Sequence, residues 1–144
     1  MHIKNPHYRE DVQRIFESAG HVQALGIQLT DVGPGWCETH LDVTPDHLQQ
    51  TDIVHAGVLA TLADHTAGAA GSTVLAPDEY VLTIEFKINL LRSARARRLW
   101  CRGQVLKAGR MITVAESDVF AASDATTKLV AKAIVTLAVL KKSG

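Results

Sequence analysis

The chain has 144 residues, of which 47% are hydrophobic and 21% charged, and Lys plus Arg balance Asp plus Glu at 15 each. This composition is typical of one soluble globular domain over residues 1–144, and the balanced charge gives no field that would attract nucleic acid or a membrane surface. The sequence has neither a signal peptide nor an apolar run near the ~20 residues of a membrane span, and its two cysteines lie far apart, so we expect a cytoplasmic protein.

The N-terminal part predicts a helix and then two strands. An apolar stripe that includes Val12 indicates a short amphipathic helix over residues 8–18. Residues 21–32 and 36–43 are typical of two strands, and alternating side chains mark the second one. The Gly-Pro-Gly run between them predicts a tight turn.

A long helix of small and aliphatic residues is expected from about residue 56 or 57 to residue 75, before Pro77. A helix without a charged face is normally buried on every side, which favours at least a dimer. The helix nevertheless contains Asp64. Burial of an ionised carboxylate costs several kcal/mol unless the group is paired or hydrogen-bonded. Asp64 therefore needs either a structural partner or a function.

Four more strands are expected, in residues 80–91, 97–109, 110–122 and 128–140, with hairpin connections at KAGR and SDATTK. In the first, alternation predicts one set of residues facing the helix: Leu82, Ile84, Phe86, Ile88 and Leu90. The same alternation turns Thr83 away from the helix. Strands grouped apart from helices indicate an α+β protein, with a curved antiparallel sheet wrapped around the long central helix.

These features resemble the hotdog-fold acyl-CoA thioesterases, in the branch with an HGG-type motif that includes phenylacetate-pathway and thioesterase-superfamily proteins. The segment QQTDIVHAGVLATLAD carries most of the resemblance, with HAG at the helix start and an Asp seven residues after its Gly. The segments INLLRSA and LKAGRM add to it. The resemblance implies a hotdog fold, an acyl-CoA substrate, no cofactor, and a homodimer that often pairs into a tetramer as a dimer of dimers.

The chain departs from the family pattern at several positions. Ala56 replaces the second residue of His-Gly-Gly, Gln49 replaces an Asn, and Asp52 replaces a Gly. Thr83 stands where a Ser is frequent, and Ser93 stands where a Pro is usual. These changes are mild, and none removes the acidic residue.

The helix start and Asp64 are the principal catalytic candidates. N–H groups at a helix start lack intrahelical partners and favour negative charge, so the N–H of Gly57 could stabilise the oxyanion formed from a thioester. Asp64 lies about 10 Å further along the helix axis, and the resemblance implies Gly57 from one protomer and Asp64 from the other. Asp64 could act as general base or as nucleophile. The structural alternatives are a tight-turn glycine and a buried, hydrogen-bonded carboxylate.

Three further residues are candidates for catalytic support. His55 could orient the thioester or only structure its loop, and Gln49 could hold the carbonyl or the water. Thr83 could position the water if the assembly brings another subunit against the face towards which it is predicted to point. His65 is expected to be an interface or packing histidine, because adjacent helical residues do not face each other.

Substrate-binding candidates lie around the helix start and in two basic turns. Coenzyme A carries phosphates that arginine binds well, which favours Arg92, Ser93 and Arg110 as nucleotide contacts. The complete set is Gln50, Ala56, Thr61, Arg92, Ser93 and Arg110. Histidine spacing does not predict a metal site. A hotdog dehydratase or hydratase and a non-catalytic acyl-CoA-binding protein remain as alternatives, and both aromatic and medium-chain acyl groups stay open.

Overall fold

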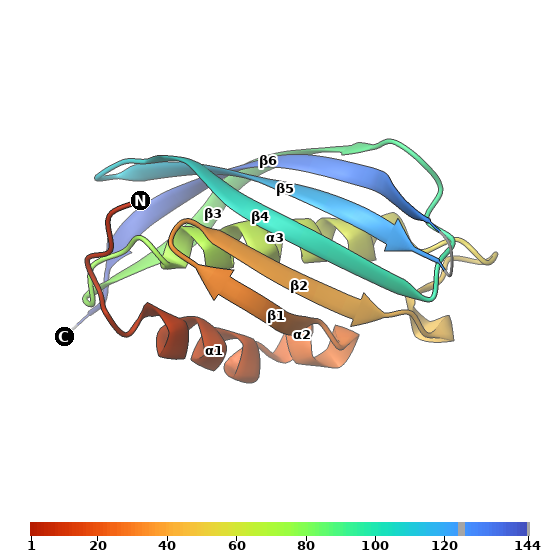
Figure 1. The fold of residues 1–144 in the computed structure, drawn as a ribbon, viewed down its shortest axis with the longest axis horizontal. Coiled ribbons are helices and arrows are strands. Elements are labelled where there is room, and N and C mark those ends of the chain that lie inside the picture. The colour runs from red at the N-terminus through yellow and green to blue at the C-terminus, as the bar shows by residue number, and fades with distance from the viewer. Residues whose placement is uncertain (124–125, 144) are drawn as a thin grey trace.

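The computed structural model describes residues 1–123 and 126–143. Its helices are α1 (Tyr8–Ser18), α2 (Gly20–Leu25) and α3 (Ala56–Ser72), with a 3-10 turn η1 (Pro45–His47). Its strands are β1 (Gln28–Gly33), β2 (Trp36–Asp42), β3 (Glu79–Leu90), β4 (Arg98–Ala108), β5 (Ile112–Ala122) and β6 (Thr127–Lys141). Figure 1 shows the sheet curving around α3, with α1 and α2 beside β1. Within the described ranges, no helix has the length and hydropathy needed to cross a membrane.

The sheet has the strand order β1-β2-β4-β5-β6-β3, and all neighbouring strands are antiparallel. Alternation in β2 is confirmed, because Cys37, Thr39 and Leu41 are fully buried. The KAGR connection joins β4 to β5 as predicted. The SDATTK connection includes residues 124 and 125, which lie outside the described residues. The predicted α+β architecture, a curved antiparallel sheet around a long helix, is confirmed.

The prediction of a strand from residue 21 is wrong, because residues 20–25 form α2. Gly26 adopts the left-handed conformation at φ 84°, and its N–H binds the carbonyls of Val22 and Gln23. Glycine at this position is a common helix end. The strand therefore begins only at Gln28, and α2 places Val22 in the core.

Small residues let α3 approach the sheet closely. A Cβ atom on Gly103 would lie 2.7 Å from the carbonyl oxygen of Thr66, so only glycine fits at that position of β4. The hydroxyl groups of Thr39 and Thr66 are 2.7 Å apart, and Ser117 Oγ donates to the carbonyl of Ala63 at 2.7 Å. These bonds satisfy buried hydroxyls where helix and sheet meet.

Within one chain α3 is covered on most sides but not on all. Its last turn closes at Thr73, whose N–H binds the carbonyl of Ala70, and the N–H of Val74 binds the carbonyl of Gly71, so the helix ends earlier than residue 75. A stripe of α3 remains accessible along its length: Gly57, Ala60, Thr61, Asp64 and Gly68. The acidic residue lies on this accessible stripe, not in the core.

A β-bulge in β3 reverses the faces that alternation predicted for its first half. Thr83 pairs with Leu137, but the next pair is Glu85 with Thr136, so Ile84 is an extra residue. Because Leu137 is buried, Thr83 lies on the helix side. The predicted orientation of Thr83, and that of Leu82 and Ile84, is therefore wrong. Beyond the bulge the prediction holds, because Phe86, Ile88 and Leu90 pair with buried residues of β6.

Candidate active site

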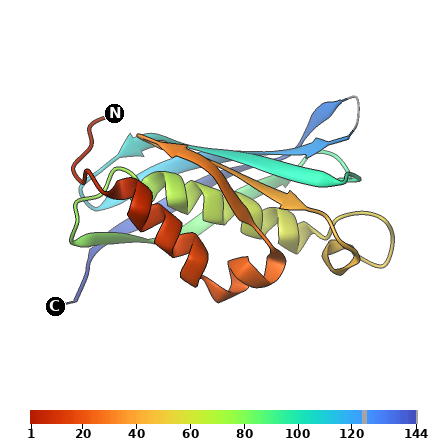
Figure 2. The same ribbon diagram turned by 60° about the horizontal axis from the view of Figure 1, so that its bottom comes forward.

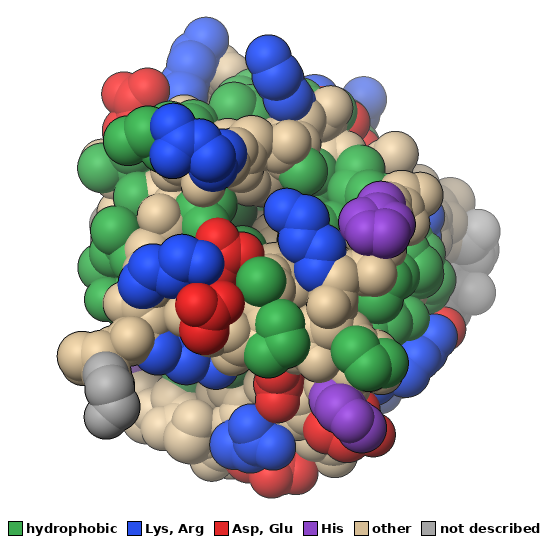
Figure 3. Space-filling model, turned by 90° about the vertical axis from the view of Figure 1, so that its left-hand side faces the viewer, with side chains coloured by type: hydrophobic (Ala, Val, Ile, Leu, Met, Phe, Trp, Pro, Cys, Tyr) green, Lys and Arg blue, Asp and Glu red, His purple; other side chains and the backbone are tan. Residues whose placement is uncertain are grey.

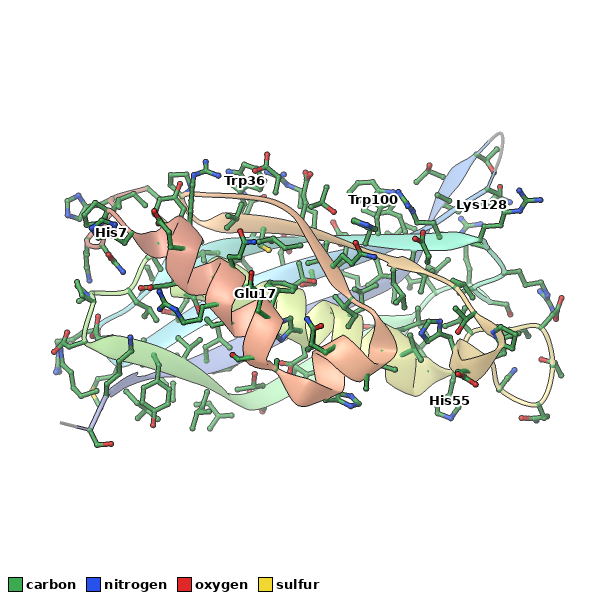
Figure 4. All side chains as sticks on the ribbon, turned by 90° about the horizontal axis from the view of Figure 1, so that it is seen from below. His7, Glu17, Trp36, His55, Trp100 and Lys128 are labelled. Atoms are coloured by element: carbon green, nitrogen blue, oxygen red, sulfur yellow. The ribbon has the colours of Figure 1, made fainter. Side chains whose placement is uncertain are left out.

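The start of α3 is capped by a histidine. His55 is the N-cap residue, and its Nδ1 atom accepts a 2.8 Å hydrogen bond from the N–H of Gly57. Figure 4 shows His55 at the N-terminal end of α3. In a neutral ring that accepts at Nδ1, the proton is on Nε2, which can then donate outward.

This cap changes which N–H group can bind an oxyanion. The Gly57 N–H was the predicted donor, but it is already bound to His55. The N–H of Ala56, the first helical residue, makes no hydrogen bond within the described part of the chain. An N–H in the first turn of a helix has no intrahelical acceptor and is a natural donor to an anion. The geometry therefore favours Ala56 over Gly57 as the donor.

Asp64 is held by Thr83. Thr83 Oγ1 donates a 2.7 Å hydrogen bond to Asp64 Oδ1 and so links β3 to α3. No Lys or Arg forms an ion pair with Asp64 among the described residues. The carboxylate is half-buried and keeps acceptor capacity for a water molecule or substrate.

A half-open pocket of about 320 Å³ lies beside this pair. Its walls include Ile15 of α1, Gly68 and Ala69 of α3, and Tyr80 and Val81 of β3. Ligand sites in proteins begin at roughly 300 Å³ and are mostly apolar with a few polar groups. We call this cavity the Asp64 pocket.

His65 lies next to Asp64 and packs its ring edge-on against Phe16, with ring centroids 4.5 Å apart. Its Nε2 atom is buried without a hydrogen-bond partner in the structure. Burial lowers the pKa of His65, although the carboxylate of Asp64 opposes that effect. These contacts agree with the predicted packing role.

A second cavity, of about 400 Å³, brings together four of the predicted residues. Gln49 and Ala56 lie on one side of it, and Arg92 and Ser93 on the other. The strand-end segment LRSA therefore reaches the loop before α3, which places Arg92 and Ser93 beside Gln49. Gln50 is exposed in the same loop and does not line this cavity.

A third cavity, of about 370 Å³, contains His55, Gly57 and Thr61 together with His21, which the sequence did not indicate. His21 Nε2 lies 3.2 Å from Thr61 Oγ1, which donates to the carbonyl of Gly57. The sequence does not indicate His21 because the pattern of residues 21–32 predicts a strand there. Gly26 as a helix end was the available signal.

Arg110 does not join the other predicted nucleotide contacts within one chain. It follows β4 in the β4–β5 turn, at the opposite end of the molecule from the loops before α3 and after β3 (Figure 1). Figure 3 views that end, where Lys and Arg side chains are spread among hydrophobic and acidic ones. Within one chain, Arg110 therefore lies far from Arg92 and Ser93.

The two cysteines are buried and free, so they do not supply a nucleophile. Burial raises the pKa of Cys101 to about 12 and that of Cys37 further still, which keeps both as thiols. Among the residues that the structure describes, no cluster of His, Cys, Asp and Glu could hold a metal ion. Asp64 thus stays the principal candidate for the chemistry.

Comparison with known proteins identifies the family. The family model described as the thioesterase superfamily matches residues 51–128, which include the start of α3, Asp64 and Thr83. The chain belongs to the thioesterase superfamily. It is accordingly a thioester hydrolase, and its curved sheet around α3 is the hotdog fold.

Relatives agree with this assignment. This thioesterase is 30% identical over 123 residues to a 1,4-dihydroxy-2-naphthoyl-CoA hydrolase of Listeria monocytogenes, covering 85% of this chain and 98% of the relative. A thioesterase family protein from Silicibacter pomeroyi has a TM-score of 0.91 and 30% identity, covering 93% of this chain and 98% of that one. A Haemophilus influenzae thioesterase has a TM-score of 0.84 and 27% identity, covering 98% and 96%.

Proposed function

We propose that this thioesterase hydrolyses an acyl-CoA to a free acid and coenzyme A, at a site that two chains build together. One chain contributes the N–H of Ala56 at the start of α3, and the other contributes Asp64 with Thr83. The observation that carries the proposal is the Asp64 carboxylate, fixed by Thr83 at 2.7 Å and open to a pocket of about 320 Å³.

The chemistry follows from these groups. As general base, Asp64 would take a proton from water while the water oxygen attacks the thioester carbonyl carbon. As nucleophile, it would form a mixed anhydride that water then hydrolyses. In both routes the Ala56 N–H stabilises the oxyanion. His55 directly precedes Ala56, and its Nε2–H could donate a second hydrogen bond to the same oxygen. Collapse of the intermediate breaks the carbon–sulfur bond, and the sulfur leaves as the thiol of coenzyme A after taking up a proton.

Two chains are needed because of distance along α3. Asp64 follows Ala56 by eight residues, which is about 12 Å along the helix axis. A carboxylate that attacks a carbonyl carbon and an N–H that binds its oxygen must both lie within about 3 Å of the reacting atoms. One helix cannot supply both groups. Two copies of α3 that run antiparallel can supply them, and they make two equal sites.

The edge of the sheet supports this dimer. β3 is an edge strand of twelve residues, and it exposes 54% of Leu82, 59% of Ile84 and 41% of Phe86. A long apolar edge with unpaired backbone groups favours pairing with another chain. An antiparallel β3–β3 contact across a two-fold axis would bring the accessible stripes of both α3 helices together. A tetramer remains a prediction.

The nucleotide is proposed to lie over the cavity of Gln49, Arg92 and Ser93, near the start of α3. An arginine and a serine can hold a phosphate group. The Listeria relative acts on a coenzyme A thioester by its name, which supports the same carrier here. Arg110 of another chain stays a candidate for a further phosphate contact.

The test is thiol release from a panel of acyl-CoAs by the native chain and by Asp64→Asn. We expect the native chain to hydrolyse at least one acyl-CoA and the variant to lose about a hundredfold or more in rate. Both proteins must have the same oligomeric size and melting temperature for this comparison. Binding of acyl-CoA without turnover by the native chain would contradict the proposal and favour the non-catalytic binding protein. Hydration of an enoyl-CoA would favour the hydratase.

A further inference from the structure

We infer that the acyl group lies in a groove along α3, between α1 and β3, and that Gly68 determines how far an acyl group can extend beyond Asp64. This inference rests on the proposed function and adds the class of acyl group. The groove would accept an elongated, mainly apolar acyl group, not only an acetyl group. We call it the acyl groove, and it consists of the Asp64 pocket and the cavity that adjoins it.

The two cavities are neighbours with common walls. The adjoining cavity, of about 240 Å³, shares Ile15, Ser72 and Tyr80 with the Asp64 pocket. Figures 2 and 4 show α1 and β3 on the two sides of α3, which forms the floor between them. From Asp64 to Ser72 the helix rises about 12 Å. The space therefore extends about two helical turns beyond the carboxylate.

Gly68 opens this space at its middle. It follows Asp64 by four residues, so both lie on one face of α3. A Cβ atom on Gly68 would meet no atom within 4 Å, whereas a Cβ on Gly71 would lie 2.5 Å from Leu137. Packing within the chain thus explains Gly71 but not Gly68. Glycine inside a helix costs about 1 kcal/mol relative to alanine, so its presence at residue 68 needs another reason.

The walls indicate the chemistry of the occupant. Next to Gly68 they are apolar, with Ile15, Ala69, Val81 and Leu137. Such walls favour an alkyl chain or an aromatic ring, because each buried methylene contributes about 0.8 kcal/mol. The far end is polar: it is lined by Arg14, Ser72, Glu79 and Lys142. A group that reaches this end can leave its tip in contact with water.

The experiment compares the native chain with Gly68→Leu on acetyl-CoA, octanoyl-CoA and phenylacetyl-CoA. We expect Gly68→Leu to lose at least about tenfold in kcat/KM on the extended substrates and to change little on acetyl-CoA. Comparison of octanoyl-CoA with phenylacetyl-CoA shows whether the groove binds an alkyl chain or an aromatic ring. Gly20→Leu is the matched control, because Gly20 is an exposed helical glycine with open space and lines none of these cavities. It should keep the native preference.

Two further measurements keep this inference apart from the proposed function. The first is the Kd of octanoyl-CoA and of acetyl-CoA, measured for Asp64→Asn and for the double variant Asp64→Asn with Gly68→Leu. Because both proteins lack the carboxylate, binding is measured without turnover. If the double variant binds octanoyl-CoA more weakly than Asp64→Asn does, but binds acetyl-CoA equally well, the result supports the groove even if the native chain hydrolyses nothing. Gly68→Ala should raise the melting temperature at native oligomeric size. An unchanged acyl preference after Gly68→Leu, or a smaller assembly, would overturn the inference and assign Gly68 to the interface.

Discussion

The hydroxyl of Thr83 donates a 2.7 Å hydrogen bond to Oδ1 of Asp64 and so connects an edge strand to the accessible face of the central helix. The β-bulge at Ile84 makes this contact possible, because the extra residue puts Thr83 on the same helix-facing side of β3 as Phe86 and Ile88. One oxygen of Asp64 is therefore fixed, and the carboxylate is oriented towards the pocket beside it.

Thr83 is accordingly a positioning residue. Thr83→Val should lower kcat by about tenfold, because a hydrogen bond to a charged group contributes about 1.5–3 kcal/mol in full burial and less at this half-exposed site. Thr83→Ser should keep most of the rate, since its hydroxyl can donate the same bond. The two rates, measured with KM for one substrate, check this. Equal rates in Thr83→Val and the native chain would remove Thr83 from the mechanism.

His55 should stabilise the start of α3 as well as the reaction. His55→Ala removes the acceptor for the Gly57 N–H and should lower the free energy of unfolding by about 1 kcal/mol. His55→Asn can still cap the helix, so it should recover stability while lacking the imidazole donor. Urea unfolding and thiol release on the three proteins separate the two roles. A full rate for His55→Asn would limit His55 to capping.

His65 should make stability fall on the acid side of neutrality. Burial lowers its pKa below the ordinary 6.5, so the unfolded chain binds a proton at a pH where the folded chain does not. The free energy of unfolding then decreases as the pH falls from the unfolded pKa towards the folded one. In His65→Phe, which can still pack against Phe16, this decrease should be smaller between about pH 7.5 and pH 5.5. Substitution of the exposed His2 by Phe is the control. If the free energy of unfolding depends on pH identically in His65→Phe and in the native chain, the prediction is wrong.

The β3 edge should hold the dimer. Ile84→Lys places a charge on the exposed edge, where 59% of the native side chain is accessible within one chain. We expect a monomer by sedimentation and loss of nearly all activity, with the native secondary structure retained. Met111→Lys is the matched control: Met111 is 62% exposed but lies in the β4–β5 turn, with β6 between it and β3. An active monomer would show that one chain completes the site.

The sequence predicted the elements that have strong periodicity. It did not predict the features that depend on the backbone conformation of a single residue. The long apolar helix and the alternation in β2 follow from composition and spacing, whereas the meeting of Gln49 with Arg92 is seen only in the fold. Two local events changed the rest. A left-handed Gly26 turned an expected strand into α2, and one extra residue at Ile84 moved Thr83 to the helix side.

The oxyanion donor illustrates another limit. Sequence placed it at Gly57 because glycine leaves space at a helix start. The side chain of His55 binds that N–H, whereas the N–H of Ala56 has no acceptor among the residues that the structure describes. Which of two adjacent N–H groups is free depends on a rotamer of the capping residue, and spacing along the chain does not encode that.

The central claim, a site shared by two chains, is tested most directly by mixing two inactive variants. Ala56→Pro removes only the proposed donor N–H, at the first helical position, where proline is tolerated; His55, at φ −61° and ψ 138°, already has the backbone conformation that proline requires before it. Asp64→Asn removes the carboxylate.

Each variant alone should be inactive, and refolding them together should restore about a quarter of the native rate. Random pairing makes half of the dimers mixed, and each mixed dimer has one intact site of two. If the mixture stays as inactive as its components while mixed dimers are present, the acid and the oxyanion donor belong to one chain, and the account of the site is wrong.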